Sequence, residues 1–103
     1  MEDAVQPRGD VACVTEVTIK NAQGLHARPA AQFVRVADKY PKAELTVEKE
    51  TLAVNGKSII GIMMLAAGPG SKLVIRAQGE GARDLLDDLE QLVDSLFGEE
   101  SAL

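Results

Sequence analysis

The sequence has few of the residues that build aromatic cores, disulfides or metal sites. Aromatic residues make up 3% of the 103 residues and tryptophan is absent, so the core must consist mainly of aliphatic side chains. The single cysteine, Cys13, excludes an internal disulfide and favours a reducing compartment, and we expect it to pack as a small apolar side chain. One histidine, His26, and one cysteine cannot supply the ligand set of a zinc ion, so no metal site is predicted.

The chain also lacks an excess of positive charge and any long apolar run. Its formal net charge of −5 argues against nucleic acid and anionic membrane surfaces as partners. No apolar run approaches the roughly 20 residues of a membrane-spanning helix. The first residues, MEDAVQPRGD, are polar and acidic and contain no apolar signal core. We therefore expect a cytoplasmic protein without membrane insertion, in which residues 1–10 form a flexible extension.

Apolar residues make up 46% of the chain, and their spacing predicts one small domain over residues 11–98 with a tail over residues 99–103. Alternating patterns predict strands over 11–20, 43–48, 51–55 and 73–78. Helical spacing predicts helices over 27–40, 58–67 and 82–97. In the third strand, Leu52 and Val54 are expected to point inward. Connections this short favour an antiparallel sheet with helices on one face, an α+β open-faced two-layer sandwich.

One short stretch, GLHARPA over residues 24–30, joins the first predicted strand to the first predicted helix. We expect His26 to be the N-cap, with Pro29 in the first turn, where a backbone N–H has no acceptor to lose. The free N–H groups and the positive helix end form an anion site, and the Arg28 guanidinium adds a donor fork suited to phosphate. Ala27 is too small to cover the imidazole. The pattern indicates phosphoryl transfer through His26; the alternative is a histidine that only caps the helix.

Glycine-containing stretches elsewhere do not complete a nucleotide-binding motif. Gly56-Lys57-Ser58 would need a glycine where Thr51 stands. The stretches at 68–70 and 79–81 lack the third glycine of the dinucleotide pattern. No cofactor is therefore predicted.

Two segments, GLHARPAAQFV at residues 24–34 and VNGKSIIGIMML at residues 54–65, occur in this order in the chain. They resemble the active-site signature and the regulatory serine segment of the HPr family, the histidine-containing phosphocarriers of the bacterial phosphoenolpyruvate:sugar phosphotransferase system. The similarity extends from about Val14 to about Phe97. It implies a four-stranded antiparallel sheet of order 1-4-2-3, covered on one face by three helices.

The resemblance also implies the chemistry of His26 and its partners. His26 would accept a phosphoryl group on Nδ1 from phosphorylated enzyme I and pass it to sugar-specific enzyme II A domains. The N–H groups of Ala27 and Arg28 and the Arg28 side chain would hold the phosphate. Such a protein is a phosphoryl carrier with a phosphohistidine intermediate rather than a stand-alone enzyme, and we expect a monomer.

Ser58 is predicted to be the N-cap of the second helix. The resemblance implies that an ATP-dependent HPr kinase/phosphorylase phosphorylates it. The helix that follows is apolar on almost every side, so one sheet cannot bury all of it and an exposed apolar patch is expected. By resemblance, Ile59, Ile60 and Met63 are the partner-binding residues of this patch.

Two other interpretations remain open. The chain could be a nitrogen-regulatory (NPr-like) phosphocarrier that feeds a different branch. It could instead be a binding module that acts on a transcriptional regulator through phosphorylated Ser58. His26 argues against a pure module, because family members that have become pure regulators lack this histidine.

Overall fold

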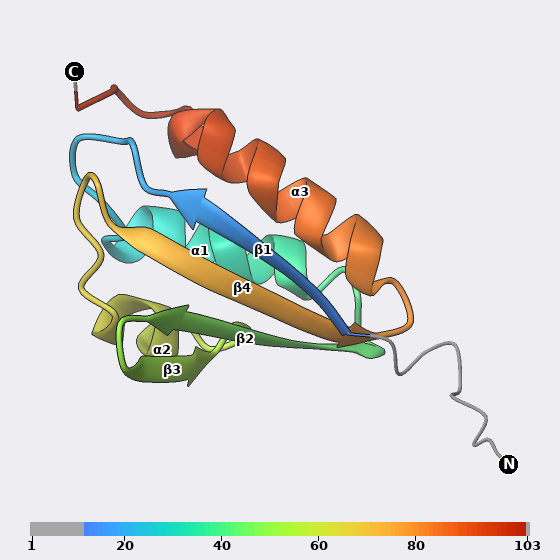
Figure 1. Cartoon of the computed structure of the whole chain (residues 1–103). Coiled ribbons are helices and arrows are strands. Elements are labelled where there is room, and N and C mark those ends of the chain that lie inside the picture. Colours follow the sequence, from blue (N-terminus) through green and yellow to red (C-terminus); the bar gives the residue numbers. More distant parts are fainter. Residues whose placement is uncertain (1–11, 103) are drawn as a thin grey trace, which may run out of the picture.

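The computed structural model describes residues 12–102, which form one sheet and three α-helices (Figure 1). The strands are β1 (Ala12–Thr18), β2 (Ala43–Lys49), β3 (Leu52–Asn55) and β4 (Lys72–Gly79). The helices are α1 (Ala27–Ala37), α2 (Ile59–Met64) and α3 (Ala82–Asp94), and the short 3-10 helix η2 (Leu96–Gly98) follows α3. The predicted extension over residues 1–10, Val11 and Leu103 lie outside the described residues. No helix in the described part of the chain is long and apolar enough to cross a membrane.

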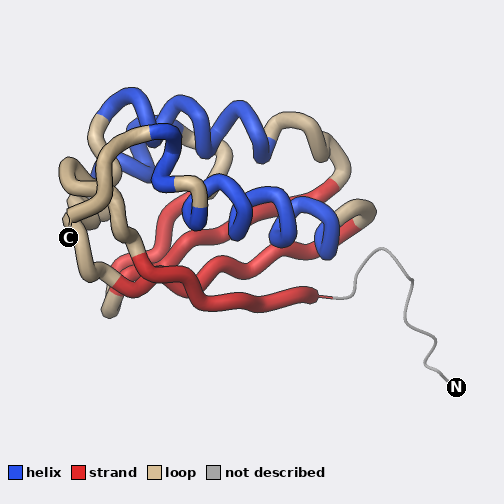
Figure 2. The backbone as a smooth tube through the Cα atoms, turned by 90° about the horizontal axis from the view of Figure 1, so that it is seen from above, coloured by secondary structure: helices blue, strands red, loops and turns tan. Residues whose placement is uncertain are grey.

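The sheet is antiparallel throughout and has the order β1-β4-β2-β3. β4 therefore lies between β1 and β2, and β3 forms an edge. The three helices cover one face and leave the other open (Figure 2). This arrangement confirms the predicted α+β open-faced sandwich and its strand order.

An aliphatic core fills the space between the sheet and the helices. Phe33 of α1, Ile75 of β4 and Leu89 of α3 are each 0% exposed. Full burial of such a side chain contributes about 1.5–3 kcal/mol. Cys13 is half-buried against this core, consistent with the packing role expected of it. Burial of these side chains holds α1 and α3 on the sheet and fixes where their ends lie.

All three helices end earlier than the periodicity predicts. α1 ends at Ala37 rather than Tyr40, because the N–H groups of Lys39 and Tyr40 bond to the carbonyls three residues back, which tightens the last turn before Pro41. α2 ends at Met64 rather than Ala67, because Ala66 has a positive φ of 51° and cannot continue a right-handed helix. The inward position expected for Leu52 is also wrong: it is 42% exposed on the edge strand β3.

The end of α3 differs most from the prediction and matters most for the site. α3 ends at Asp94, and the backbone of Leu96, Phe97 and Gly98 has positive φ values of 63°, 54° and 75°. For bulky residues this conformation costs about 1–2 kcal/mol each, and burial of Phe97 in the core offsets part of that cost. The chain therefore reverses here instead of continuing the helix.

After this reversal, residues 100–102 pair with residues 20–22, which follow β1. The Ala22 N–H donates to the Glu100 carbonyl and the Ala102 N–H donates to the Lys20 carbonyl, each at 2.9 Å. Asn21 and Ser101 form an antiparallel bridge between them. We call residues 99–102 the C-terminal strap. It brings the end of the chain beside the loop that precedes α1.

Candidate functional site

His26 occupies the N-cap position of α1, as the sequence predicts. Its backbone is extended, with φ −79° and ψ −166°, and its carbonyl accepts the hydrogen bond of Ala30 at 3.0 Å. Its side chain makes no capping hydrogen bond to the helix. The ring is 37% exposed. A histidine that only caps the helix would use its ring for that bond, so the geometry favours a role outside the helix.

The residues predicted to bind an anion lie in the first turn of α1. Ala27 and Arg28 follow the N-cap and are exposed, and Pro29 packs inward. First-turn N–H groups have no intrahelical acceptor. This turn contains no acidic residue that would neutralise the positive helix end. The ring of His26, two backbone donors and a guanidinium therefore share one end of one helix.

His26 and Arg28 also line one cavity of about 390 Å³. The rest of its lining comes from the loop before α1 and from the end of the chain: Ala22, Gln23, Gly98, Glu99 and Glu100. The cavity opens to solvent, so a group bound there remains accessible to a partner protein.

The loop before His26 lies close to the segment that follows α2. The Leu25 N–H donates to the Ala67 carbonyl at 2.9 Å. Gly24 has a positive φ of 68°, and a Cβ placed there would lie 2.4 Å from the Ala67 carbonyl oxygen. Only glycine allows the two backbone segments to lie this close, which explains why a glycine stands two residues before the histidine.

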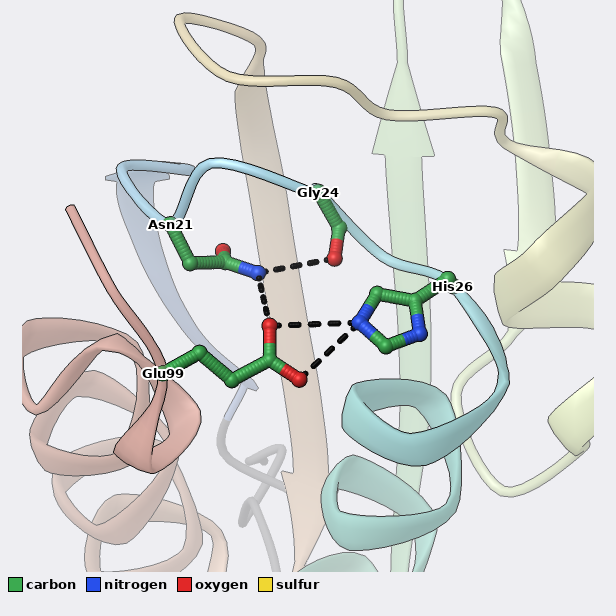
Figure 3. Close-up of polar contacts among 4 residues, drawn as sticks. All are labelled: Asn21, Gly24, His26 and Glu99. Carbon is green, nitrogen blue, oxygen red and sulfur yellow. Dashed lines mark hydrogen bonds and ion pairs between the residues drawn. The ribbon is translucent and has the colours of Figure 1, made fainter. Parts of the chain in front are cut away.

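Glu99 of the C-terminal strap is the direct partner of the His26 ring. Its Oε2 and Oε1 lie 2.9 and 3.2 Å from His26 Nε2 (Figure 3). The other ring nitrogen, Nδ1, faces away from this carboxylate. The Glu99 side chain is 13% exposed, so solvent screens this contact less than it screens a surface ion pair.

Asn21 holds the carboxylate of Glu99 from the other side. Its Nδ2 donates to Glu99 Oε1 at 3.0 Å and to the Gly24 carbonyl at 2.8 Å (Figure 3). Asn21 is 0% exposed, and its Oδ1 has no hydrogen-bond partner among the described residues. A buried acceptor left unpaired costs about 1–3 kcal/mol. The unpaired Oδ1 therefore lowers the stability of the fold, and the two hydrogen bonds that Nδ2 donates offset this loss.

Opposing influences act on the ionisation of Glu99. Burial alone would raise its pKa, but hydrogen bonds from Asn21 and His26 and the charges of His26 and Arg28 together outweigh burial and lower the pKa. Glu99 is therefore a carboxylate at neutral pH.

Ser58 caps α2, as predicted. Its Oγ accepts the Gly61 N–H at 3.0 Å. The apolar residues predicted to form a patch beside it are exposed: Ile59 by 42%, Ile60 by 73% and Met63 by 42%. Met64, 62% exposed, extends the same surface and was not predicted. Ile62 is fully buried and anchors the short helix to the core.

Asn21 and Glu99 are the site residues that sequence reasoning missed. Glu99 lies 73 residues from His26 and belongs to an acidic pair that is part of no motif. Asn21 lies in a turn, where asparagine is favoured for local reasons. No local pattern distinguishes either residue, because their contacts depend on the chain reversal after α3.

Comparison with known proteins agrees with this fold and shows its family. A family model described as the PTS HPr component phosphorylation site matches residues 14–95. The phosphocarrier protein HPr of Pseudomonas aeruginosa is 44% identical over 84 residues, which cover 82% of this chain and 93% of that protein.

Solved structures give the same result. HPr-C-His from Thermoanaerobacter tengcongensis has a TM-score of 0.81 at 42% identity and covers 85% of this chain and 98% of its own. An HPr dimer from the same organism has a TM-score of 0.68 at 43% identity, with 81% and 94% covered. The chain therefore belongs to the HPr family, the phosphocarrier proteins of the phosphotransferase system.

Proposed function

We propose that His26 accepts a phosphoryl group on Nδ1 from phosphorylated enzyme I and delivers it to the A domain of a sugar-specific enzyme II. The observation that carries this proposal is the placement of the ring. Nε2 is bound by Glu99, whereas Nδ1 faces away from this carboxylate. The residue lies at the amino end of α1 and lines one cavity together with Arg28.

The chemistry follows from this placement. A neutral imidazole attacks phosphorus through the Nδ1 lone pair, and the N–P bond of the donor phosphohistidine breaks as the new N–P bond forms. Oxygens of the transferred group accept hydrogen bonds from the N–H groups of Ala27 and Arg28 and from the guanidinium. Such charge-assisted bonds contribute about 1.5–3 kcal/mol each. A small number of such hydrogen bonds binds the phosphoryl group without holding it too tightly, because a carrier must release the group to the next protein.

The test is phosphorylation in a purified system. We expect phosphoenolpyruvate and enzyme I to add one acid-labile phosphoryl group to the protein, mapped to His26 by mass spectrometry. His26→Ala should accept none and should keep the circular dichroism spectrum and melting temperature of a folded domain. Acid-labile phosphorylation of His26→Ala would contradict the assignment.

We further propose that HPr kinase/phosphorylase phosphorylates Ser58 and that Ile59, Ile60 and Met63 belong to the surface that partners contact. A phosphate at Ser58 would add about two negative charges beside these exposed apolar side chains. An acidic partner that docks there would be repelled, and a basic partner would be favoured. A role on a transcriptional regulator through phosphorylated Ser58 is therefore a second candidate function.

The acceptor protein determines whether this carrier serves the sugar branch or the nitrogen-regulatory branch of the system. Transfer from phosphorylated His26 to a sugar enzyme II A domain would support the sugar branch, and transfer only to a nitrogen-regulatory acceptor would support the NPr-like alternative. We propose a cytoplasmic monomer, since the partners of such a carrier must reach both the His26 and the Ser58 surfaces. Light scattering would distinguish a monomer from a dimer such as the solved relative forms.

A further inference from the structure

We propose that Glu99 and Asn21 are positioning residues of the phosphoryl site: the C-terminal strap holds the His26 ring with its hydrogen on Nε2, which leaves the Nδ1 lone pair free for attack. The consequence for transfer rests on the proposed function. The position of the hydrogen is a property of the unphosphorylated protein and is tested without any transfer.

The first step concerns which atom can donate. An ionised carboxylate only accepts hydrogen bonds. Both Glu99 oxygens lie within 3.2 Å of His26 Nε2, so the hydrogen of this contact belongs to the ring nitrogen. A neutral imidazole carries one ring hydrogen, and its other nitrogen is then an acceptor. Glu99 thus selects the form of His26 in which Nδ1 is the nucleophile.

The second step concerns what holds Glu99. Asn21 Nδ2 has two hydrogens, and the structure uses both: one reaches Glu99 Oε1 and the other reaches the Gly24 carbonyl. This buried amide therefore joins the strap to the loop that carries His26 (Figure 3). The backbone pairing of residues 20–22 with residues 100–102 fixes the strap directly after Glu99. The carboxylate is held on both sides, and the ring orientation follows from it.

The third step concerns charge during transfer. When the Nδ1 lone pair forms the new N–P bond, the electron pair of the breaking bond returns to the donor nitrogen. The His26 ring keeps its Nε2 hydrogen and gains positive charge. The Glu99 carboxylate is already beside that hydrogen, so it stabilises the charge as it develops without moving. On delivery to an acceptor the ring returns to neutral, and no proton has to leave or enter the site.

The experiment uses Glu99→Gln and Glu99→Ala, with Glu100→Gln as the matched control. Glu100→Gln removes the same charge from the neighbouring residue of the strap, which binds Ala22 through its backbone carbonyl and not its side chain. Gln at position 99 keeps a hydrogen-bond acceptor without the charge, and Ala removes both. Glu99 is part of a solvent-facing cavity, so both variants are expected to fold.

The first readout is the pair of imidazole ¹⁵N chemical shifts of neutral His26 in the unphosphorylated protein. We expect shifts of a ring with hydrogen on Nε2 alone in the wild type and in Glu100→Gln. In Glu99→Ala they should move toward the averaged values of a free histidine side chain. Hydrogen on Nδ1 in the wild type, or identical shifts in the wild type and Glu99→Ala, would overturn the proposal.

The second readout is transfer from enzyme I. Loss of a partner that orients a metal-ligating histidine costs roughly 10–100-fold in affinity or activity. By analogy we expect kcat to fall about tenfold in Glu99→Ala, less in Glu99→Gln, and KM to stay constant. A rise in KM alone would assign Glu99 to docking and overturn the positioning role. If the wild type accepts no phosphoryl group, the proposed function fails while the ¹⁵N result still decides the role of Glu99.

Discussion

Glu99 Oε2 lies 2.9 Å from Nε2 of His26, although 73 residues separate them in the chain. The contact joins the end of the chain to the amino end of α1, and the reversal at η2 makes it possible. The site of this protein is therefore assembled from two distant segments. One contributes His26 and the first turn of α1, and the other contributes the carboxylate that binds the ring.

Arg28→Ala tests the anion site directly. We expect the variant to fold normally, because the side chain is exposed, and to accept the phosphoryl group about tenfold more slowly, because a charge-assisted hydrogen bond is lost. Arg35→Ala is the matched control, since Arg35 is an exposed arginine in the last turn of the same helix. Rapid-quench measurement of transfer from enzyme I compares the two. Equal rates for both variants would remove Arg28 from the phosphate site.

Ser58→Asp tests regulation at the second site. Aspartate and asparagine are both good N-caps, so Ser58→Asp and its neutral control Ser58→Asn should keep the cap of α2. We expect Ser58→Asp to raise KM for enzyme I several-fold, because it adds negative charge beside the exposed apolar surface. Ser58→Asn should behave like the wild type. The regulatory role would be refuted if the charged and neutral variants showed the same kinetics.

Gly24→Ala tests the close approach beneath the site. The new Cβ would lie 2.4 Å from the Ala67 carbonyl oxygen in a backbone conformation that favours glycine. We expect a loss of about 1–3 kcal/mol in the free energy of unfolding. Gly68→Ala is the matched control on the opposing segment, because nothing lies within 4 Å of a Cβ there. Urea denaturation measures both, and similar stabilities would show that the loop relaxes without strain.

The lowered pKa of Glu99 predicts an acid-dependent contribution to stability. In the folded protein the pKa of Glu99 lies below its ordinary value of 4.5, so its carboxyl group ionises more readily. Its stabilising effect is therefore present above pH 4.5 and is lost as the pH falls through the lower, folded value. The groups that lower this pKa are the Asn21 amide and, at the amino end of α1, His26 and Arg28.

Thermal unfolding of the wild type and Glu99→Gln across the acid range measures this contribution. We expect the wild type to have the higher melting temperature near neutral pH and the two curves to converge below pH 4.5. A difference that stayed constant down to strongly acid pH would show that ionisation of Glu99 does not stabilise the fold.

Local patterns predicted the helices and strands of the fold and the N-cap positions of His26 and Ser58. The alternation around Val17 and Ile75 gave strands, and His26 and Ser58 both became N-caps because the residues that determine a cap lie within one turn. The sheet order came from family resemblance rather than from periodicity. These features depend on short stretches or on a recognised motif.

The contacts that were missed depend on long-range geometry. Leu96 and Phe97 continue the apolar spacing of α3, so periodicity extends the helix through them, whereas the backbone reverses there with positive φ. Without that reversal the strap cannot reach Asn21, and neither Glu99 nor its contact with His26 can be inferred. Leu52 was misplaced for a related reason: alternation shows which face a side chain takes, but not whether a helix covers that part of the edge strand.

The most direct test of the central claim is a ³¹P–¹⁵N correlation spectrum of the protein labelled with ¹⁵N in His26 and phosphorylated by enzyme I. We expect the phosphorus to couple to Nδ1, with the hydrogen retained on Nε2 beside Glu99. Phosphorus bound to Nε2, or no phosphorus on His26 at all, would contradict the account.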